Sequence, residues 1–274
     1  MKKNILYSTL FIITVLFTDN HHNGKRDYQN ATTQVEETYR LNHENQTLAY
    51  VLAQKEKYGK PRKVMAMWQA IELLENFVDA SDPDLALGQI HHAMQTAEHM
   101  RAHNLPEWLI LTGFIHDVGK ILYFFDEPQW AVVGDTFPVG CAFSESIVYH
   151  HLFENNPDTQ NPLFTTKYGI YTPNCGLYNV HMSWGHDEYL YQIVHDCLPE
   201  EAAYIIRYHS FYAQHTHHAY EHLLSHRDYT LMKWVELFNR YDLYTKDATP
   251  IDVETLKPYY KALVEKYFPY ELAW

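Results

Sequence analysis

His116 and Asp117 are the neighbouring residues in this sequence best suited to metal chemistry. They come near the end of residues 106–120, which are apolar on nearly every side and therefore predict a buried helix. Pro106 suits the first turn of this helix, and Gly119 suits its end. A buried imidazole beside a buried carboxylate is costly unless something neutralises the pair, and a metal ion does so. We therefore expect His116 and Asp117 to bind a metal.

Four further candidate ligands, His92, His186, His209 and Asp242, lie on four other predicted helices. Four imidazoles and two carboxylates are enough for two metal ions, with Asp117 as the shared ligand. Nitrogen and oxygen donors without a thiolate suit iron or manganese better than a structural zinc. The same donors also occur in hydrolytic metal sites, so the ligand types leave the reaction open.

The elements that must position these side chains all read as helices. Apolar periodicity and capping signals predict helices over residues 34–57, 64–78, 90–103, 144–153, 184–197, 229–244 and 253–268, and one more that begins at Pro199. Residues 127–142 and 155–179 are rich in turn formers and read as loops. The histidines of residues 215–218 read as part of a solvated turn. Because no strand pattern or internal repeat appears, we predict an all-α fold.

Composition limits the classes of function. The chain has 274 residues, of which 46% are hydrophobic, so it can build one large core or at most two small ones. The formal net charge is −13 and no basic run appears, which argues against a nucleic-acid partner. The three cysteines form no close-spaced pair and therefore predict a reduced protein rather than a disulfide framework.

The N-terminus differs from the rest of the chain. Two lysines precede an apolar run at residues 5–17, which looks like the core of a signal peptide and is too short for an ordinary membrane span. We predict an apolar, signal-like segment and arm over residues 1–22, and one catalytic helical domain over residues 23–274. We expect a cytoplasmic monomer, with export or membrane tethering through residues 1–18 as the alternative.

The order His92, then His116-Asp117, then Asp242 on separate helices resembles the HD-domain superfamily, and longer runs resemble one family within it, myo-inositol oxygenase. The runs are His92-Ala-Met-Gln-Thr-Ala-Glu98, His116-Asp-Val-Gly-Lys120, Glu127-Pro-Gln-Trp-Ala-Val-Val-Gly-Asp-Thr-Phe-Pro-Val-Gly-Cys141, Met182-Ser-Trp-Gly-His-Asp-Glu-Tyr189, Arg207-Tyr-His-Ser-Phe-Tyr212 and Asp242-Leu-Tyr-Thr-Lys246. The resemblance implies an HD-domain-like helical bundle around a buried dinuclear metal site. It implies a mixed-valent Fe(II)/Fe(III) enzyme that uses O2 to cleave the ring of myo-inositol to D-glucuronate.

The resemblance also assigns roles by position. The iron ligands that it implies are His92, His116 and Asp242 for one iron, His186 and His209 for the other, and Asp117 as the bridge. The contacts to the polyol that it implies are Arg26, Asp79, Ser81, Lys120, Gly134, Asp135, His209, Ser210 and Lys246. Asp117 and Lys120 would be catalytic, with Lys120 favouring the substrate alkoxide. Without the resemblance, Lys120 also fits a helix C-terminal lysine that complements the helix dipole.

Two other functions remain open from the sequence. The metal ligands of an HD-type metal-dependent phosphohydrolase would be the same His92, His116, Asp117 and Asp242. Such an enzyme would also need a cradle of several cationic side chains for the phosphate. Near the motifs the candidates are only Lys120, Arg207 and Lys246. A binding module without catalysis is the third interpretation, and the complete ligand set argues against it.

Overall fold

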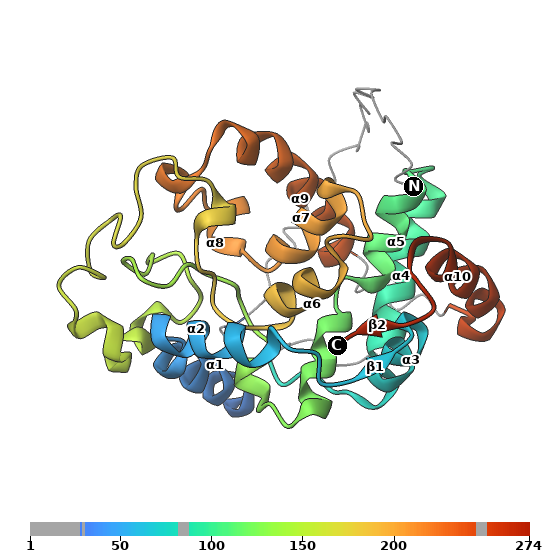
Figure 1. Cartoon of the computed structure of the whole chain (residues 1–274), viewed down its shortest axis with the longest axis horizontal. Helices are drawn as coiled ribbons and strands as arrows, with labels where there is room; N and C mark the ends of the chain where they lie inside the picture. The colour runs from blue at the N-terminus through green and yellow to red at the C-terminus, as the bar shows by residue number, and fades with distance from the viewer. Residues whose placement is uncertain (1–27, 29–30, 82–87, 245–250) are drawn as a thin grey trace.

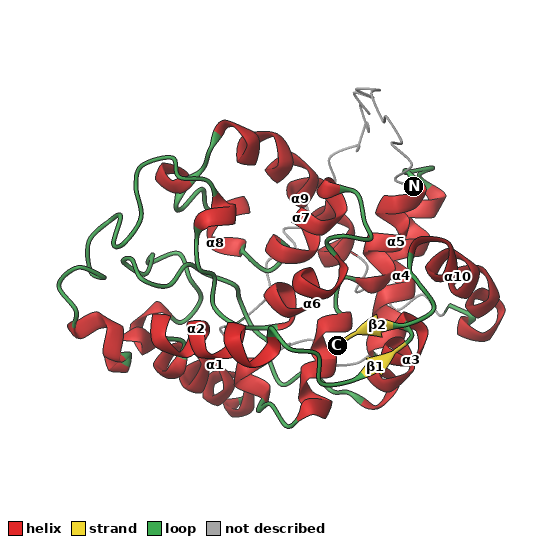
Figure 2. Cartoon of the chain, viewed as in Figure 1, coloured by secondary structure: helices red, strands yellow, loops and turns green. Residues whose placement is uncertain are grey.

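The computed structural model describes residues 28, 31–81, 88–244 and 251–274. The expectations for the segment 1–22, for Arg26 and for Lys246 therefore lie outside the described residues. Helices dominate the described part. Its strands are β1 (Val64–Met65) and β2 (Leu272–Ala273), which lie side by side in space next to the C-terminus (Figure 2). The predicted all-α class is confirmed, and the buried apolar side chains form one continuous core that runs from Val51 to Trp274.

The helices pack together as a bundle. The α-helices are α1 (Thr33–Asn45), α2 (Leu48–Tyr58), α3 (Met67–Leu73), α4 (Gln89–Ala102), α5 (Glu107–Ile115), α6 (His186–Val194), α7 (Glu200–Tyr208), α8 (Tyr212–His215), α9 (His226–Tyr244) and α10 (Val253–Tyr267). The 3-10 helices are η1 (Leu74–Asn76), η2 (Val118–Phe125), η3 (Gln129–Ala131), η4 (His150–Asn155), η5 (Pro157–Gln160), η6 (Leu177–Asn179) and η7 (Glu221–Leu223). Helices α4 and α5 run side by side with α10 packed against them, α6 and α7 pack together, and α7 also packs on α9 (Figure 1).

Helix α5 is the apolar element predicted from the sequence, and residues 109–115 are all buried. Its ends differ from the prediction. Pro106 lies at the N-cap instead of inside the first turn, and the helix ends at Ile115, not at Gly119. Asp117 adopts φ −92° and ψ 0°, outside the α-helical region, and η2 follows it. The helix therefore ends at the candidate ligand pair, His116 and Asp117.

The single helix predicted over residues 34–57 is wrong in two respects. The chain forms α1 and α2 there, and the side chain of Thr47 accepts the N–H of Tyr50 to begin the second helix. The pair is also not simply exposed, because Val35, Tyr39 and Val51 are fully buried. The cap residue is visible in the sequence, but the burial comes from contacts with distant segments.

Other boundaries also differ from the predictions. The helix predicted over residues 64–78 begins as strand β1 (Val64–Met65), which pairs antiparallel with β2 (Leu272–Ala273). Within the segment predicted as a helix over residues 144–153, only the 3-10 helix η4 forms, and it begins at His150. His215 ends the short helix α8 and is buried, whereas a solvated turn was predicted for it. Each difference depends on long-range contacts, which local periodicity does not report.

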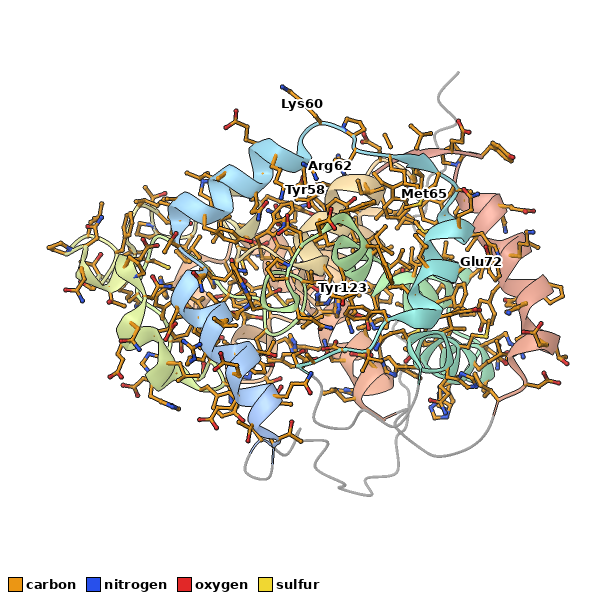
Figure 3. The ribbon with its side chains drawn as sticks, turned by 90° about the horizontal axis from the view of Figure 1, so that it is seen from below. Tyr58, Lys60, Arg62, Met65, Glu72 and Tyr123 are labelled. Carbon is orange, nitrogen blue, oxygen red and sulfur yellow. The ribbon has the colours of Figure 1, made fainter. Side chains whose placement is uncertain are left out.

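The last residue fixes the small sheet to the core. The indole N–H of Trp274 donates to the carbonyl of Met65 at 3.0 Å, and the carbonyl of Trp274 accepts the backbone N–H of Arg62. The guanidinium of Arg62 lies 5.2 Å from the centre of the Tyr58 ring, while Lys60 extends away from the protein (Figure 3). The C-terminus is thereby part of the folded domain.

His43 is a buried neutral histidine in α1. Its ring stacks on Phe153 with centroids 4.0 Å apart, and its Nε2 lies 2.7 Å from the carbonyl oxygen of Val148. Burial lowers the pKa of His43 from 6.5 to about 4. Between these two values the unfolded chain binds a proton that the folded chain does not, so stability falls as the pH falls through this window.

We predict that His43→Gln removes this part of the acid sensitivity. The variant should be less stable at neutral pH, because it loses the ring stacking. The difference in unfolding free energy between the two proteins should then shrink by up to about 3 kcal/mol from about pH 7.5 to about pH 4. Urea unfolding across this range measures it. Parallel pH profiles for the two proteins would contradict the assignment.

Candidate metal centre

The first ligand group joins three helices. His92 comes from α4, His116 from the C-cap of α5, and Asp242 from α9. The Nε2 atom of His92 lies 2.8 Å from Asp242 Oδ1, and the Nε2 atom of His116 lies 3.3 Å from the same oxygen. Asp117 Oδ2 lies 3.4 Å from His116 Nε2. Four side chains from three distant stretches of the sequence thus present nitrogen and oxygen atoms to one point.

The second ligand group lies on the other side of Asp117. Its Oδ1 atom lies 3.4 Å from His186 Nε2 and 3.7 Å from His209 Nε2. The two imidazole nitrogens are 3.3 Å apart. One oxygen of Asp117 therefore faces His116, and the other faces His186 and His209. This is the arrangement that a carboxylate needs to bridge two ions.

Three of the imidazoles are held so that Nε2 faces the centre. In each, Nδ1 lies against a backbone carbonyl: His116 with Gly113 at 2.9 Å, His186 with Val132 at 2.8 Å, and His209 with Ile206 at 3.0 Å. A ring that donates Nδ1–H to a carbonyl keeps the Nε2 lone pair for a metal. The backbone has therefore set the tautomer that metal binding requires.

The carboxylates of the site are ionised although they are buried. Burial raises the pKa of Asp117, but Lys120 and His116 outweigh it and hold that pKa well below its usual value. Burial lowers the pKa of His116, but the nearby Asp117 and Asp242 carboxylates raise it by more, so that the pKa is about 10. A metal at this point would replace the proton of His116, so binding should release protons.

The donor set fits two metal ions. Two groups of ligand atoms each lie within 4.8 Å of one another, and Asp117 belongs to both. These groups are His92 with His116 and Asp117, and Asp117 with His186 and His209. They contain imidazole and carboxylate without thiolate, the donors that suit iron and manganese. Among the described residues these are the groups that could hold a metal.

Asp187 is a site residue that the sequence reasoning missed. It is buried, and its Oδ1 atom lies 2.7 Å from His186 Nε2 and 3.4 Å from His209 Nε2. Its other oxygen accepts the backbone N–H of Ser210 and the hydroxyl of Thr136, both at 3.1 Å. The signal was present in the sequence, since His186-Asp187 repeats the His-Asp pair at 116–117.

Lys120 points into the site and is buried there. Its Nζ atom lies 2.8 Å from both Asp117 Oδ2 and Asp79 Oδ2, and it donates to Gln89 Oε1 at 3.2 Å. Burial lowers the pKa of Lys120, but the two carboxylates raise it above its ordinary value. Lys120 is thus an ammonium group next to the candidate ligand Asp117, and it lies in η2, beyond the C-terminal end of α5.

Most of the described residues expected to contact a polyol lie near these groups. Ser81 donates from both its N–H and its hydroxyl to Asp79 Oδ1, which connects it to Lys120. The hydroxyl of Ser210 lies 3.4 Å from His186 Nε2. Asp135 is buried and accepts the hydroxyl of Tyr39 at 3.0 Å, and the preceding Gly134, with φ +102°, lies beside the same ring.

Fold and site together define a class of protein, a mainly helical bundle with buried His/Asp groups that could hold a pair of metal ions. The family model described as Myo-inositol oxygenase matches residues 32–274. Inositol oxygenase 1 of Arabidopsis thaliana is 54% identical over 248 residues, which are 88% of this chain and 80% of that protein. The chain belongs to the myo-inositol oxygenase family.

Relatives outside plants match over a similar length. The inositol oxygenase of Dictyostelium discoideum is 47% identical over 260 residues, covering 91% of this chain and 89% of the relative. The inositol oxygenase of Mus musculus is 49% identical over 243 residues, covering 86% of this chain and 85% of the relative. The span of the family model, residues 32–274, contains every residue of both ligand groups.

Gly119 brings the two ligand groups together. A Cβ atom at this position would lie 2.1 Å from the carbonyl oxygen of His186, so no larger residue fits without movement. Gly119 lies in η2, two residues after Asp117, and His186 begins α6. The close contact between η2 and α6 therefore places Asp117 within reach of His186.

We predict that Gly119→Ala separates the two groups. The added methyl pushes the η2 and α6 backbones apart, which typically costs about 1–3 kcal/mol of stability. It should also lower the affinity for the metal ion at His186 and His209 more than the affinity for the metal ion at His92 and His116. Urea unfolding and metal analysis measure the two effects. Gly88→Ala is the matched control, because nothing lies within 4 Å of a Cβ there. An unchanged metal count and stability in Gly119→Ala would contradict this role.

Proposed function

We propose that this protein is an inositol oxygenase, which uses O2 to convert myo-inositol to D-glucuronate with two irons as its cofactor. The observation that carries the proposal is the orientation of Asp117, whose two oxygens face different imidazole groups. Membership of the family and the names of the relatives support the same reaction. The balanced reaction consumes one O2 per inositol and yields one D-glucuronate and one water.

We assign the ligands of the two irons from the two groups. His92, His116 and Asp242 would hold the first iron, His186 and His209 the second, with Asp117 shared. The bound irons supply the redox capacity that oxygen chemistry requires, which no protein side chain of the site offers. A mixed-valent Fe(II)/Fe(III) pair is part of this proposal.

Lys120 is the residue that we propose acts on the substrate alcohol. Its ammonium lies beside Asp117 and is held between two carboxylates, so it can donate to a polyol oxygen close to the irons. A donor that faces a developing alkoxide stabilises it. Because Lys120, Asp79 and Asp117 are all buried, water is kept from the reacting atoms.

The other proposed contacts are hydroxyl and carboxylate groups that can bind a polyol. Asp79 and Ser81 form one hydrogen-bonded group with Lys120, and Ser210 lies beside His186. The full set that we propose is Arg26, Asp79, Ser81, Lys120, Gly134, Asp135, His209, Ser210 and Lys246. His209 would act through the iron that it binds.

The phosphohydrolase alternative is less well supported. A phosphate cradle needs cationic groups that can turn toward the ligand. Lys120 is already held by two carboxylates, and Arg207 is paired with Glu188 inside the protein. The third candidate, Lys246, lies outside the described residues.

We also propose the wider context of the enzyme. The single continuous core supports one catalytic domain over residues 23–274, preceded by the segment 1–22. Three free cysteines are typical of a reducing compartment and support a cytoplasmic enzyme. Export or tethering through residues 1–18 remains the alternative, and the monomeric state is part of the same proposal.

We predict that the iron-loaded protein consumes O2 only when myo-inositol is present, and forms D-glucuronate in equal amount. An oxygen electrode and chromatography of the product measure both. His209→Ala should fold and keep the first ligand group, yet should lose turnover. Release of phosphate from phosphorylated substrates without oxygen uptake would contradict the proposal and support the hydrolase.

We predict that Lys120→Met keeps two irons but lowers turnover by about a hundredfold, because one donor to a developing alkoxide is removed. Binding of inositol should also weaken. Lys57→Met is a matched control, since it removes a half-exposed lysine paired with Glu127, which is not a residue of this site. Near-normal turnover of Lys120→Met with a lowered melting temperature would leave Lys120 with a structural role only.

A further inference from the structure

A buried ion pair connects the two helices that carry the second ligand group. Arg207, in the last turn of α7, donates from Nε to Glu188 Oε2 at 2.7 Å and from Nη2 to Glu188 Oε1 at 3.3 Å. Glu188 lies in the first turn of α6. Their side chains are only 5% and 4% exposed. The two hydrogen bonds hold guanidinium and carboxylate in one plane, which fixes direction as well as distance.

The surroundings keep both charged groups in place. Lys55 of α2 also reaches Glu188, with its Nζ atom 2.8 Å from Oε1. The guanidinium carbon of Arg207 lies 4.7 Å from the centre of the Tyr191 ring and 5.3 Å from that of Tyr208. Aromatic faces at this distance attract a cation. The pair is therefore fully compensated, with α2 as a third support.

The position of this pair relative to the histidines is what gives it a role. Glu188 comes two residues after His186, and Arg207 comes two residues before His209. Side chains two residues apart on a helix point about 200° apart. The ion pair and the histidine pair are therefore on different faces of α6 and α7. Two connections on different faces fix the rotation of each helix about its own axis.

We propose that Glu188 and Arg207 are positioning residues for the second metal ion, because they set the helix orientations at which His186 and His209 meet. A buried ion pair adds little net stability over apolar side chains of the same volume, whereas its geometry is specific. The distance of 3.3 Å between the two Nε2 atoms depends on that geometry. The inference rests on the two-metal function proposed above.

The test is Arg207→Met, which keeps most of the length of the side chain and removes its charge and its paired N–H donors. Glu188 keeps Lys55 as a partner, so no carboxylate is left unpaired and the fold should persist. With Mn²⁺ as the probe, equilibrium dialysis measures each binding step without any need for activity. We expect the first ion to bind normally and the second to bind about tenfold to hundredfold more weakly, the range for groups that orient metal ligands.

Tyr204→Phe is the matched control on the same helix. It removes a buried hydrogen bond to Asp228 at 2.9 Å and should lower the melting temperature without changing either metal affinity. Arg207→Lys keeps the charge but lacks the paired, planar N–H donors, so it should recover the affinity for the second metal ion only in part. Equal affinities in Arg207→Met and wild type would overturn the positioning role. A wild-type protein that binds a single ion would instead overturn the proposed two-metal function.

Discussion

The structure depends on keeping one buried carboxylate, that of Asp117, ionised at the junction of several helices. A carboxylate removed from water takes up a proton or destabilises the fold unless cations compensate it. Here Lys120 contacts one oxygen at 2.8 Å, His116 lies near the same oxygen, and His186 lies near the other. The groups that compensate Asp117 are also the groups that would hold and use the metals. Stability of the site and its chemistry therefore share one cause.

This requirement explains how the helices end. Helix α5 ends at Ile115, so His116 and Asp117 leave the regular helix and can face one centre from adjacent positions. The next turn has glycine at position 119 because the carbonyl of His186 occupies the space of a side chain. This close approach of the Gly119 backbone to the His186 carbonyl is thus what lets Asp117 face both groups.

Part of this account could be predicted from the sequence. The apolar run before His116 predicted a buried helix, and the residue types predicted nitrogen and oxygen ligands. The family resemblance named six candidate ligands. The structure places five of them in two groups that share Asp117, with Asp242 beside His116. Asp187 was missed, although it repeats the His-Asp pair, because a single acidic residue in a helix is usually solvated.

The remaining features depend on contacts between distant segments, which no local pattern reports. The pairing of β1 with β2 joins residues 64 and 273, and only the folded chain brings them together. The contact of Gly119 with His186 and the pair of Glu188 with Arg207 are of the same kind. From the sequence, Gly119 is interpreted as a helix end, and Arg207 only as a candidate cation for a phosphate.

The central claim is that Asp117 bridges two irons. Mössbauer spectroscopy of the iron-loaded protein tests it most directly, because ions joined by a bridging ligand are magnetically coupled and separate ions are not. The account predicts two irons per chain in the spectrum of a coupled pair, and uncoupled iron after Asp117→Ala. Two magnetically isolated irons in the wild-type protein, or a single iron per chain, would contradict it.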